Sequence, residues 1–255
     1  MKRKPIKSLF SLTQITLGLL LVFSLVACSK GNAPVLKSST VISISTQIPE
    51  DTAINRQIAP YKAKLQAEIS QVIGESAVDM PKQKTGEYAL GNWMADVYLE
   101  EAKAKFPKAQ IGLVASGGIR ASIQKGLFTI GNAFEIMPFE NELVVLAIKG
   151  SVLSEIVAEH NQSKKLNFSG ILVSLKSANS TISLNGNTTH PDSTYYLATS
   201  DYLANGGDNL TMLKKRTEIF YTKIKVRTAI IGHIQKLSET KNKINTPTIN
   251  RISFL

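Results

Sequence analysis

Two glycine pairs, Gly117-Gly118 and Gly206-Gly207, constrain the fold of this chain more than any other feature. Glycine adopts left-handed backbone angles and lets a ligand approach the main chain closely. The apolar run 111–114 predicts a short buried strand that ends at the first pair. Ligands bind at such strand ends in α/β sheets, so we expect a binding site at this turn.

Side chains suited to a nucleoside accompany both pairs. Arg120 follows the first pair and offers a planar fork for phosphate or ribose oxygens. Phe139 and Tyr202 offer flat faces for a base, and Asp208 can accept hydrogen bonds from two hydroxyls. Taken alone, the rings are also typical of a core and the charged groups of a solvated surface. Together, these segments predict a nucleoside pocket.

Strands and helices are predicted to interleave along the chain. The helical periodicity begins near Thr52 and includes Ile54, Ile58, Tyr61, Leu65 and Ile69. We expect further helices over 90–106, 152–160 (capped by Ser151) and 225–237, and strands over 41–48, 111–114, 143–148, 171–175, 182–184, 195–199 and 249–254, with a turn at Asn185-Gly186. This order predicts an α/β fold with mixed sheets and interleaved helices.

Five segments, in order, resemble the C-terminal, substrate-binding domain of the 5'-nucleotidase family. They are 74–75 with 90–96, 115–120, 126–130 leading to 138–141, 146–150, and 202–208. The resemblance covers about 73–237 and places 74–75 in an opening loop. It implies a layered α/β/β/α arrangement.

The resemblance also implies roles for individual residues. The base would lie between Phe139 and Tyr202, with Arg120 at the ribose or phosphate side and Asp208 accepting from sugar hydroxyls. The other expected substrate-binding residues are Lys84, Asn141, Gly117, Gly118, Gly206 and Gly207. Lys84 stands where the family commonly has an arginine, and Ala115 where it often has an asparagine. These departures predict weaker binding or preference for another base.

The N-terminus predicts export and a lipid anchor. Residues 1–28 combine a basic start with an apolar stretch that is short for a membrane span. The segment 25–28 resembles a bacterial lipoprotein box, which implies acylation of Cys28, the only cysteine. Ser29 and Lys30 follow without an aspartate, which by the same resemblance favours the outer membrane, facing the periplasm. We expect a flexible tether over 29–40 and one domain over 41–255.

The mature chain is expected to remain basic. Cleavage before Cys28 removes four positive charges and no negative ones, so the net charge falls from +11 to +7. A basic balance favours encounter with anions such as nucleotides. We expect no nucleic-acid partner, because the lysines are scattered and no nucleic-acid-binding motif is present.

Metal chemistry is not expected in this chain. Members of the resembled family cleave phosphate with two metal ions held by an N-terminal metallophosphatase domain, and the three histidines here, His160, His190 and His233, have no ligand-spaced neighbours. The prediction is therefore no catalytic residue and no cofactor in this chain, with a divalent metal pair on a partner metallophosphatase polypeptide. The chain would be the nucleotide-binding half of a split 5'-nucleotidase in nucleotide catabolism, inactive alone. The alternatives are an exported nucleoside-binding lipoprotein and a degenerate scaffold.

Overall fold

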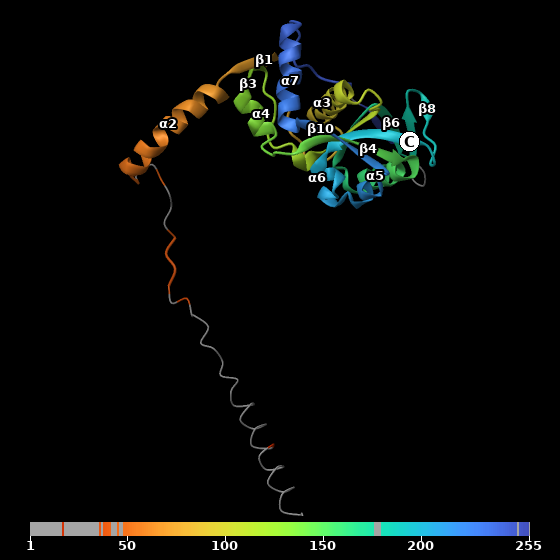
Figure 1. The fold of residues 1–255 in the computed structure, drawn as a ribbon, viewed down its shortest axis with the longest axis horizontal. Coiled ribbons are helices and arrows are strands. Elements are labelled where there is room, and N and C mark those ends of the chain that lie inside the picture. The colour runs from red at the N-terminus through yellow and green to blue at the C-terminus, as the bar shows by residue number, and fades with distance from the viewer. Residues whose placement is uncertain are drawn as a thin grey trace, which may run out of the picture. The chain divides into compact units, whose positions relative to one another are not determined.

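The computed structural model describes residues 48–175, 180–248 and 250–254, together with Leu17, Leu36, 38–41 and Ser45 (Figure 1). Two units can be separated, Met1–Thr52 and Ala53–Leu255. Cys28 lies outside the described residues, as does most of the expected signal peptide and tether. The strand expected over 41–48 falls largely outside them too, and Val41, Ser45 and Ile48 are not in a strand.

Within the described ranges, the structure contains no helix with both the length and the apolarity needed to span a bilayer.

A five-stranded mixed sheet forms the centre of the domain. Its order is β10-β4-β9-β2-β5, with strands β2 (Ile111–Ala115), β4 (Glu142–Lys149), β5 (Leu166–Ser169), β9 (Thr194–Ser200) and β10 (Glu218–Lys225). The β2–β9 pair is parallel and the other pairs are antiparallel. The predicted mixed α/β fold is therefore confirmed.

Both faces of this sheet are buried. On β4, Leu143 and Val145 face one core while Val144 and Leu146 face the other, as the two-residue period of a strand requires. Helices α3 (Ala89–Lys105) and α7 (Val226–Glu239) cover the first face, and α5 (Gly150–Ser163) packs on the second. The near-continuous apolar runs of β2 and β4 follow from this double burial.

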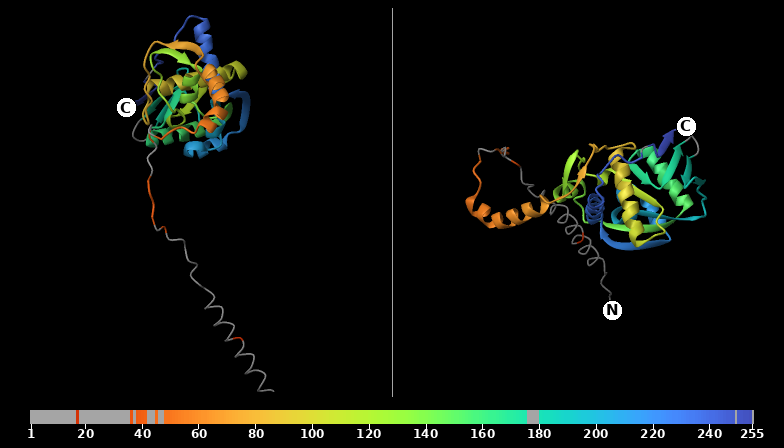
Figure 2. Two further views of the ribbon diagram at one scale, coloured as in Figure 1. Left: turned by 90° about the vertical axis from the view of Figure 1, so that its left-hand side faces the viewer. Right: turned by 90° about the horizontal axis from the view of Figure 1, so that it is seen from above.

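A four-stranded sheet contributes to the second core. Its order is β11-β6-β7-β8, with strands β6 (Ile171–Leu175), β7 (Ser180–Leu184), β8 (Asn187–Thr188) and β11 (Ile252–Phe254). Asn185 and Gly186 both have positive φ, at 52° and 81°, as a two-residue hairpin turn requires. The last strand pairs with β6 in parallel, so the C-terminal end lies beside this sheet (Figure 2).

Two local expectations were wrong. The segment 74–75 lies in strand β1 (Val72–Ser76), not in a loop, and pairs with β3 (Gly126–Thr129). Ser151 does not cap α5, because the helix already begins at Gly150. A side chain at Gly150 would lie 2.1 Å from the His190 carbonyl oxygen, and the Gly150 amide donates to Ser193. This close approach requires a glycine at the first residue of the helix.

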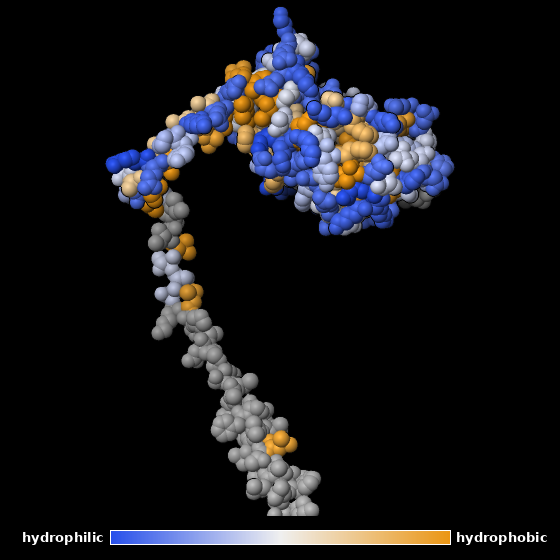
Figure 3. Space-filling view, in the orientation of Figure 1, coloured by the Kyte–Doolittle hydropathy of each residue, from blue (hydrophilic) through white to orange (hydrophobic). Residues whose placement is uncertain are grey.

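Helix α2 (Thr52–Ile69) forms as its periodicity predicted, but its apolar face is not part of the core. The exposed side chains on it are Ile54, Ile58, Tyr61 and Leu65. Figure 3 shows apolar surface along α2 and over β3 and the short helix α4 (Ile130–Ile136), where Leu127 and Phe134 are exposed. A helical apolar period thus identifies the element here without identifying what covers it.

Candidate functional site

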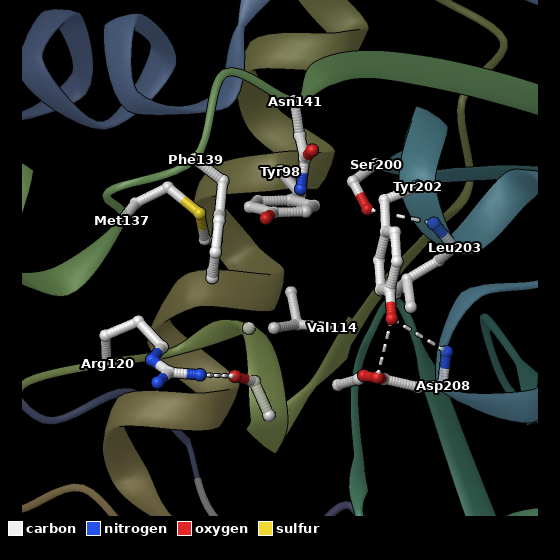
Figure 4. Close-up of a pocket in the computed structure, with 13 residues that line it drawn as sticks. Tyr98, Val114, Arg120, Met137, Phe139, Asn141, Ser200, Tyr202, Leu203 and Asp208 are labelled. Atoms are coloured by element: carbon white, nitrogen blue, oxygen red, sulfur yellow. Dashed lines mark hydrogen bonds between the residues drawn. The ribbon is translucent and has the colours of Figure 1, made fainter. Parts of the chain in front are cut away.

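A cavity of about 240 Å³ opens at one end of the five-stranded sheet. We call it the slot (Figure 4). It is lined by Tyr98, Val114, Ala115, Gly117, Gly118, Arg120, Met137, Phe139, Asn141, Ser200, Tyr202, Leu203 and Asp208. These residues come from α3, the end of β2 and the turn after it, the segment before β4, and the end of β9 and the turns after it. Seven of the ten predicted substrate-binding residues therefore lie in one cavity.

Two aromatic rings bound the slot. Phe139 and Tyr202 stand on edge and face each other across the opening (Figure 4). Phe139 is 39% exposed and Tyr202 is 50% exposed, so neither ring belongs to the core. Exposed rings of this kind leave flat apolar faces available for stacking.

The pairing of two strands places these rings opposite each other. Because β4 and β9 are antiparallel, the start of β4 lies beside the end of β9, with Leu143 paired to Ser200. The Asp201 carboxylate then accepts from the amides of Glu142, at 3.0 Å, and Tyr202, at 2.8 Å. One side chain thereby links the segments that carry the two rings.

The Tyr202 hydroxyl holds Asp208. It donates to the Asp208 carboxylate at 3.1 Å, and the Asp208 amide donates back to it at 3.3 Å. Gly207 allows the ring to pack against this turn, because an added side chain there would lie 2.5 Å from the Tyr202 ring. Gly206 has φ +88°, which favours glycine. Gly206 and Gly207 line a shallow cleft beside Tyr202 and Asn141 rather than the slot itself.

Arg120 lies at the same end of the slot as Asp208, on the Phe139 side (Figure 4). Its guanidinium carbon is 5.7 Å from the centre of the Phe139 ring, and one nitrogen donates to the Gly117 carbonyl at 3.5 Å. A guanidinium has five N–H donors, so most remain available to an anion.

A second cavity, of about 360 Å³, adjoins this end. We call it the basic cavity. Its lining residues are Lys82, Lys84, Ser116, Gly117, Arg120, Lys165, Asp208 and Asn209. Lys84 therefore lies beside the slot and not in it. Four cationic side chains against one carboxylate give this cavity a positive potential that attracts anions.

Several lining residues were not predicted from the sequence. Tyr98, Lys82 and Lys165 are not among the substrate-binding residues expected from the sequence. Tyr98 lies on the buried face of α3, and its side chain also lines the slot. The two lysines come from loops whose proximity to Arg120 only the folded structure reveals.

Two arginines outside the slot hold its two sides. Arg227, on α7, donates to the carbonyls of Met137 at 3.2 Å and Phe139 at 3.4 Å, and pairs with Glu140. It also lies 3.9 Å over the Phe134 ring.

Arg216 holds the segment that follows Tyr202 on the other side of the slot. It donates to the Ala204 carbonyl at 2.6 Å and to the Asn205 side chain at 3.4 Å. Each side of the slot is therefore fixed by charge-assisted hydrogen bonds to backbone or side-chain oxygens.

The histidines lie outside both cavities. Burial lowers the pKa of His160 to about 4, with Lys164 adding to the shift, and its neutral Nδ1 accepts from the Leu166 amide at 3.2 Å. His233 lies beside Glu100 and Glu101, and burial lowers its pKa as well. No group of three His, Cys, Asp or Glu side chains that could hold a metal ion occurs among the described residues.

Comparison with known proteins gives consistent matches. The chain matches the family model "5'-nucleotidase, C-terminal domain" over residues 68–215. It is 26% identical over 238 residues to the trifunctional nucleotide phosphoesterase protein YfkN of Bacillus subtilis (strain 168), covering 84% of this chain and 16% of YfkN. It is 29% identical over 218 residues to the snake venom 5'-nucleotidase of Macrovipera lebetinus. This match covers 72% of this chain and 53% of the venom protein.

A solved structure of a 5'-nucleotidase also resembles this chain. The 5'-nucleotidase precursor from Thermus thermophilus superimposes with a TM-score of 0.67 at 27% identity, covering 81% of this chain and 44% of that one. The chain thus spans roughly half of this structure, and less of YfkN.

The contacts of Arg227 lead to a prediction about local stability. Arg227→Met removes charge-assisted hydrogen bonds, each worth about 1.5–3 kcal/mol. The hydrogen-bonded amides of Met137 and Glu142 should therefore exchange about ten- to a hundredfold faster, as measured by hydrogen-exchange NMR.

Arg216→Met is the matched control. It should accelerate exchange in 203–206 and leave the amides of Met137 and Glu142 unchanged. Equal exchange of these two amides in wild type and Arg227→Met would show that Arg227 does not hold this segment.

Proposed function

Because the chain belongs to the 5'-nucleotidase C-terminal domain family, we propose that it binds a nucleoside or nucleotide, with the base between Phe139 and Tyr202. The observation that carries this proposal is the pair of exposed rings facing each other across the slot. Stacking of a base on an aromatic side chain contributes about 1–3 kcal/mol.

The end of the slot with Arg120 and Asp208 suits the sugar and phosphate. Asp208 accepts from ribose hydroxyls, and its orientation is already set by the Tyr202 hydroxyl. Arg120 and the lysines of the basic cavity, Lys82, Lys84 and Lys165, face the phosphate side. A preorganised, positively charged site loses less entropy when an anionic ligand binds.

The catalytic half is proposed to lie on a separate polypeptide. Relatives such as the snake venom 5'-nucleotidase contain additional sequence beyond the matched part. The described residues here offer no cluster of metal ligands. We therefore assign this chain the nucleotide-binding role in a split 5'-nucleotidase, with the divalent metal pair on a metallophosphatase partner.

Ligand binding should stabilise the folded chain. A ligand that binds only the native state adds about 2.7 kcal/mol at a hundredfold excess over Kd, so adenosine or AMP should raise the melting temperature. Phe139→Ala and Tyr202→Ala should each weaken binding by about ten- to a hundredfold in calorimetry. Asp208→Ala should weaken adenosine binding more than adenine binding.

Tyr221→Ala serves as the control, since Tyr221 is an exposed aromatic residue on β10 that does not line the slot. It should bind like wild type. If wild type shows no thermal shift with any nucleoside or nucleotide at millimolar concentration, the degenerate scaffold is the better interpretation.

The split arrangement predicts that the purified chain alone releases no phosphate from AMP in the presence of Mg²⁺, Mn²⁺ or Zn²⁺. Adding a metallophosphatase-domain polypeptide from the same organism should restore metal-dependent release, measured as inorganic phosphate. Phe139→Ala in this chain should then reduce the restored rate at low AMP. Clear metal-dependent turnover by the isolated chain would refute the split.

We further propose that the chain is exported and anchored at Cys28 to the outer membrane, facing the periplasm. The support is the basic and apolar N-terminal sequence ending in the lipoprotein-like box. Cys28→Ser should abolish incorporation of labelled fatty acid and move the protein out of the detergent phase. Normal detergent partitioning of Cys28→Ser would rule out this anchor.

A further inference from the structure

The hydroxyl of Tyr98 is one of the polar groups in the slot that have no protein partner among the described residues. Tyr98 lies on α3, is 3% exposed and lines the slot. Among the described residues its hydroxyl has no hydrogen-bond partner, whereas the Tyr202 hydroxyl bonds to Asp208 and that of Ser200 accepts from Leu203. Because the Tyr98 side chain lines the slot, its hydroxyl takes its hydrogen-bond partner from water or from a ligand.

Tyr98 occupies a particular end of the slot. Figure 4 places it between Phe139 and Tyr202, on the side of Asn141, with Arg120 and Asp208 at the opposite end. A base stacked between the two rings, with its sugar toward Asp208, would present its outer edge to Tyr98 and Asn141.

The hydroxyl remains protonated at neutral pH. Burial raises the pKa of Tyr98, and the negative charge of Asp201 raises it further. A neutral phenol both donates and accepts a hydrogen bond, so it can pair with an amino group, a carbonyl or a ring nitrogen.

Few other side chains of the slot can pair with a base. Val114, Ala115 and Met137 have no strong hydrogen-bonding side chain, and the Ser200 hydroxyl already accepts from the Leu203 amide. The side chain of Asn141 has no partner among the described residues either, and it also lines the slot.

We infer that Tyr98 is a specificity-determining residue whose hydroxyl pairs with the polar edge of the six-membered ring of the bound base. The inference rests on the proposed nucleoside site and adds to it a ligand class. The slot selects nucleosides whose base carries hydrogen-bonding groups on the edge remote from the sugar. An equally flat base without such groups stacks but leaves the hydroxyl unpaired.

The test compares Tyr98→Phe with wild type by calorimetry. The probes are the tightest-binding of adenosine, guanosine, cytidine and uridine, and benzimidazole riboside, which keeps a flat two-ring shape without polar groups on the six-membered ring. The variant should bind the natural nucleoside about three- to tenfold more weakly, the loss of one neutral hydrogen bond. It should bind benzimidazole riboside like wild type.

Stability separates recognition from a structural role. Because the hydroxyl has no protein partner, Tyr98→Phe should not lower the melting temperature of the unliganded chain. Tyr196→Phe is the matched control: Tyr196 packs against Phe106 outside the slot, and its variant should bind both probes like wild type.

Each remaining outcome is informative. Unchanged binding of the natural nucleoside by Tyr98→Phe overturns this inference and leaves the proposed function intact. An equal loss for both probes also overturns it, because it indicates a change in the shape of the slot. No binding of any nucleoside or of its monophosphate by wild type refutes the proposed function itself.

Discussion

The antiparallel pairing of β4 with β9 is the interaction on which the candidate site depends. Seven residue pairs set its register, from Leu143 with Ser200 to Lys149 with Thr194. The Asp201 carboxylate extends the link beyond the strands by accepting from Glu142 and Tyr202. A slip of one residue would turn every β4 side chain to the opposite core and separate the two aromatic rings. The same register therefore fixes the core and the slot.

Two of the strands that sequence reasoning identified, β2 and β4, are buried on both faces. The runs of β2 and β4 are apolar throughout because each face meets a core. Strand β10 was not predicted, for the opposite reason. It lies at the edge of the sheet, only Thr222 is buried, and its pairing is interrupted near Lys223, which has φ 63°. Such an edge has neither a continuous apolar run nor a clean alternation.

The candidate site shows a similar division. Residues that belong to a glycine turn or an aromatic segment, such as Arg120, Phe139 and Asp208, could be predicted because local sequence carries their chemistry. Tyr98 could not, since a helical period gives a pocket-facing residue the same signal as a core residue. Lys84 was predicted from a resemblance, and its position beside Lys82 in an adjoining cavity depends on loop packing that the local sequence does not specify.

The backbone at Asp208 limits how this turn can evolve. Its φ of 51° lies in the left-handed region, which aspartate and asparagine accept more readily than longer side chains. Glutamate would keep the charge but meet the steric cost of that conformation. Asparagine would keep the shape and lose the charge. Among relatives of this chain, an asparagine here would therefore identify a domain that retains this turn without the carboxylate proposed to contact the sugar.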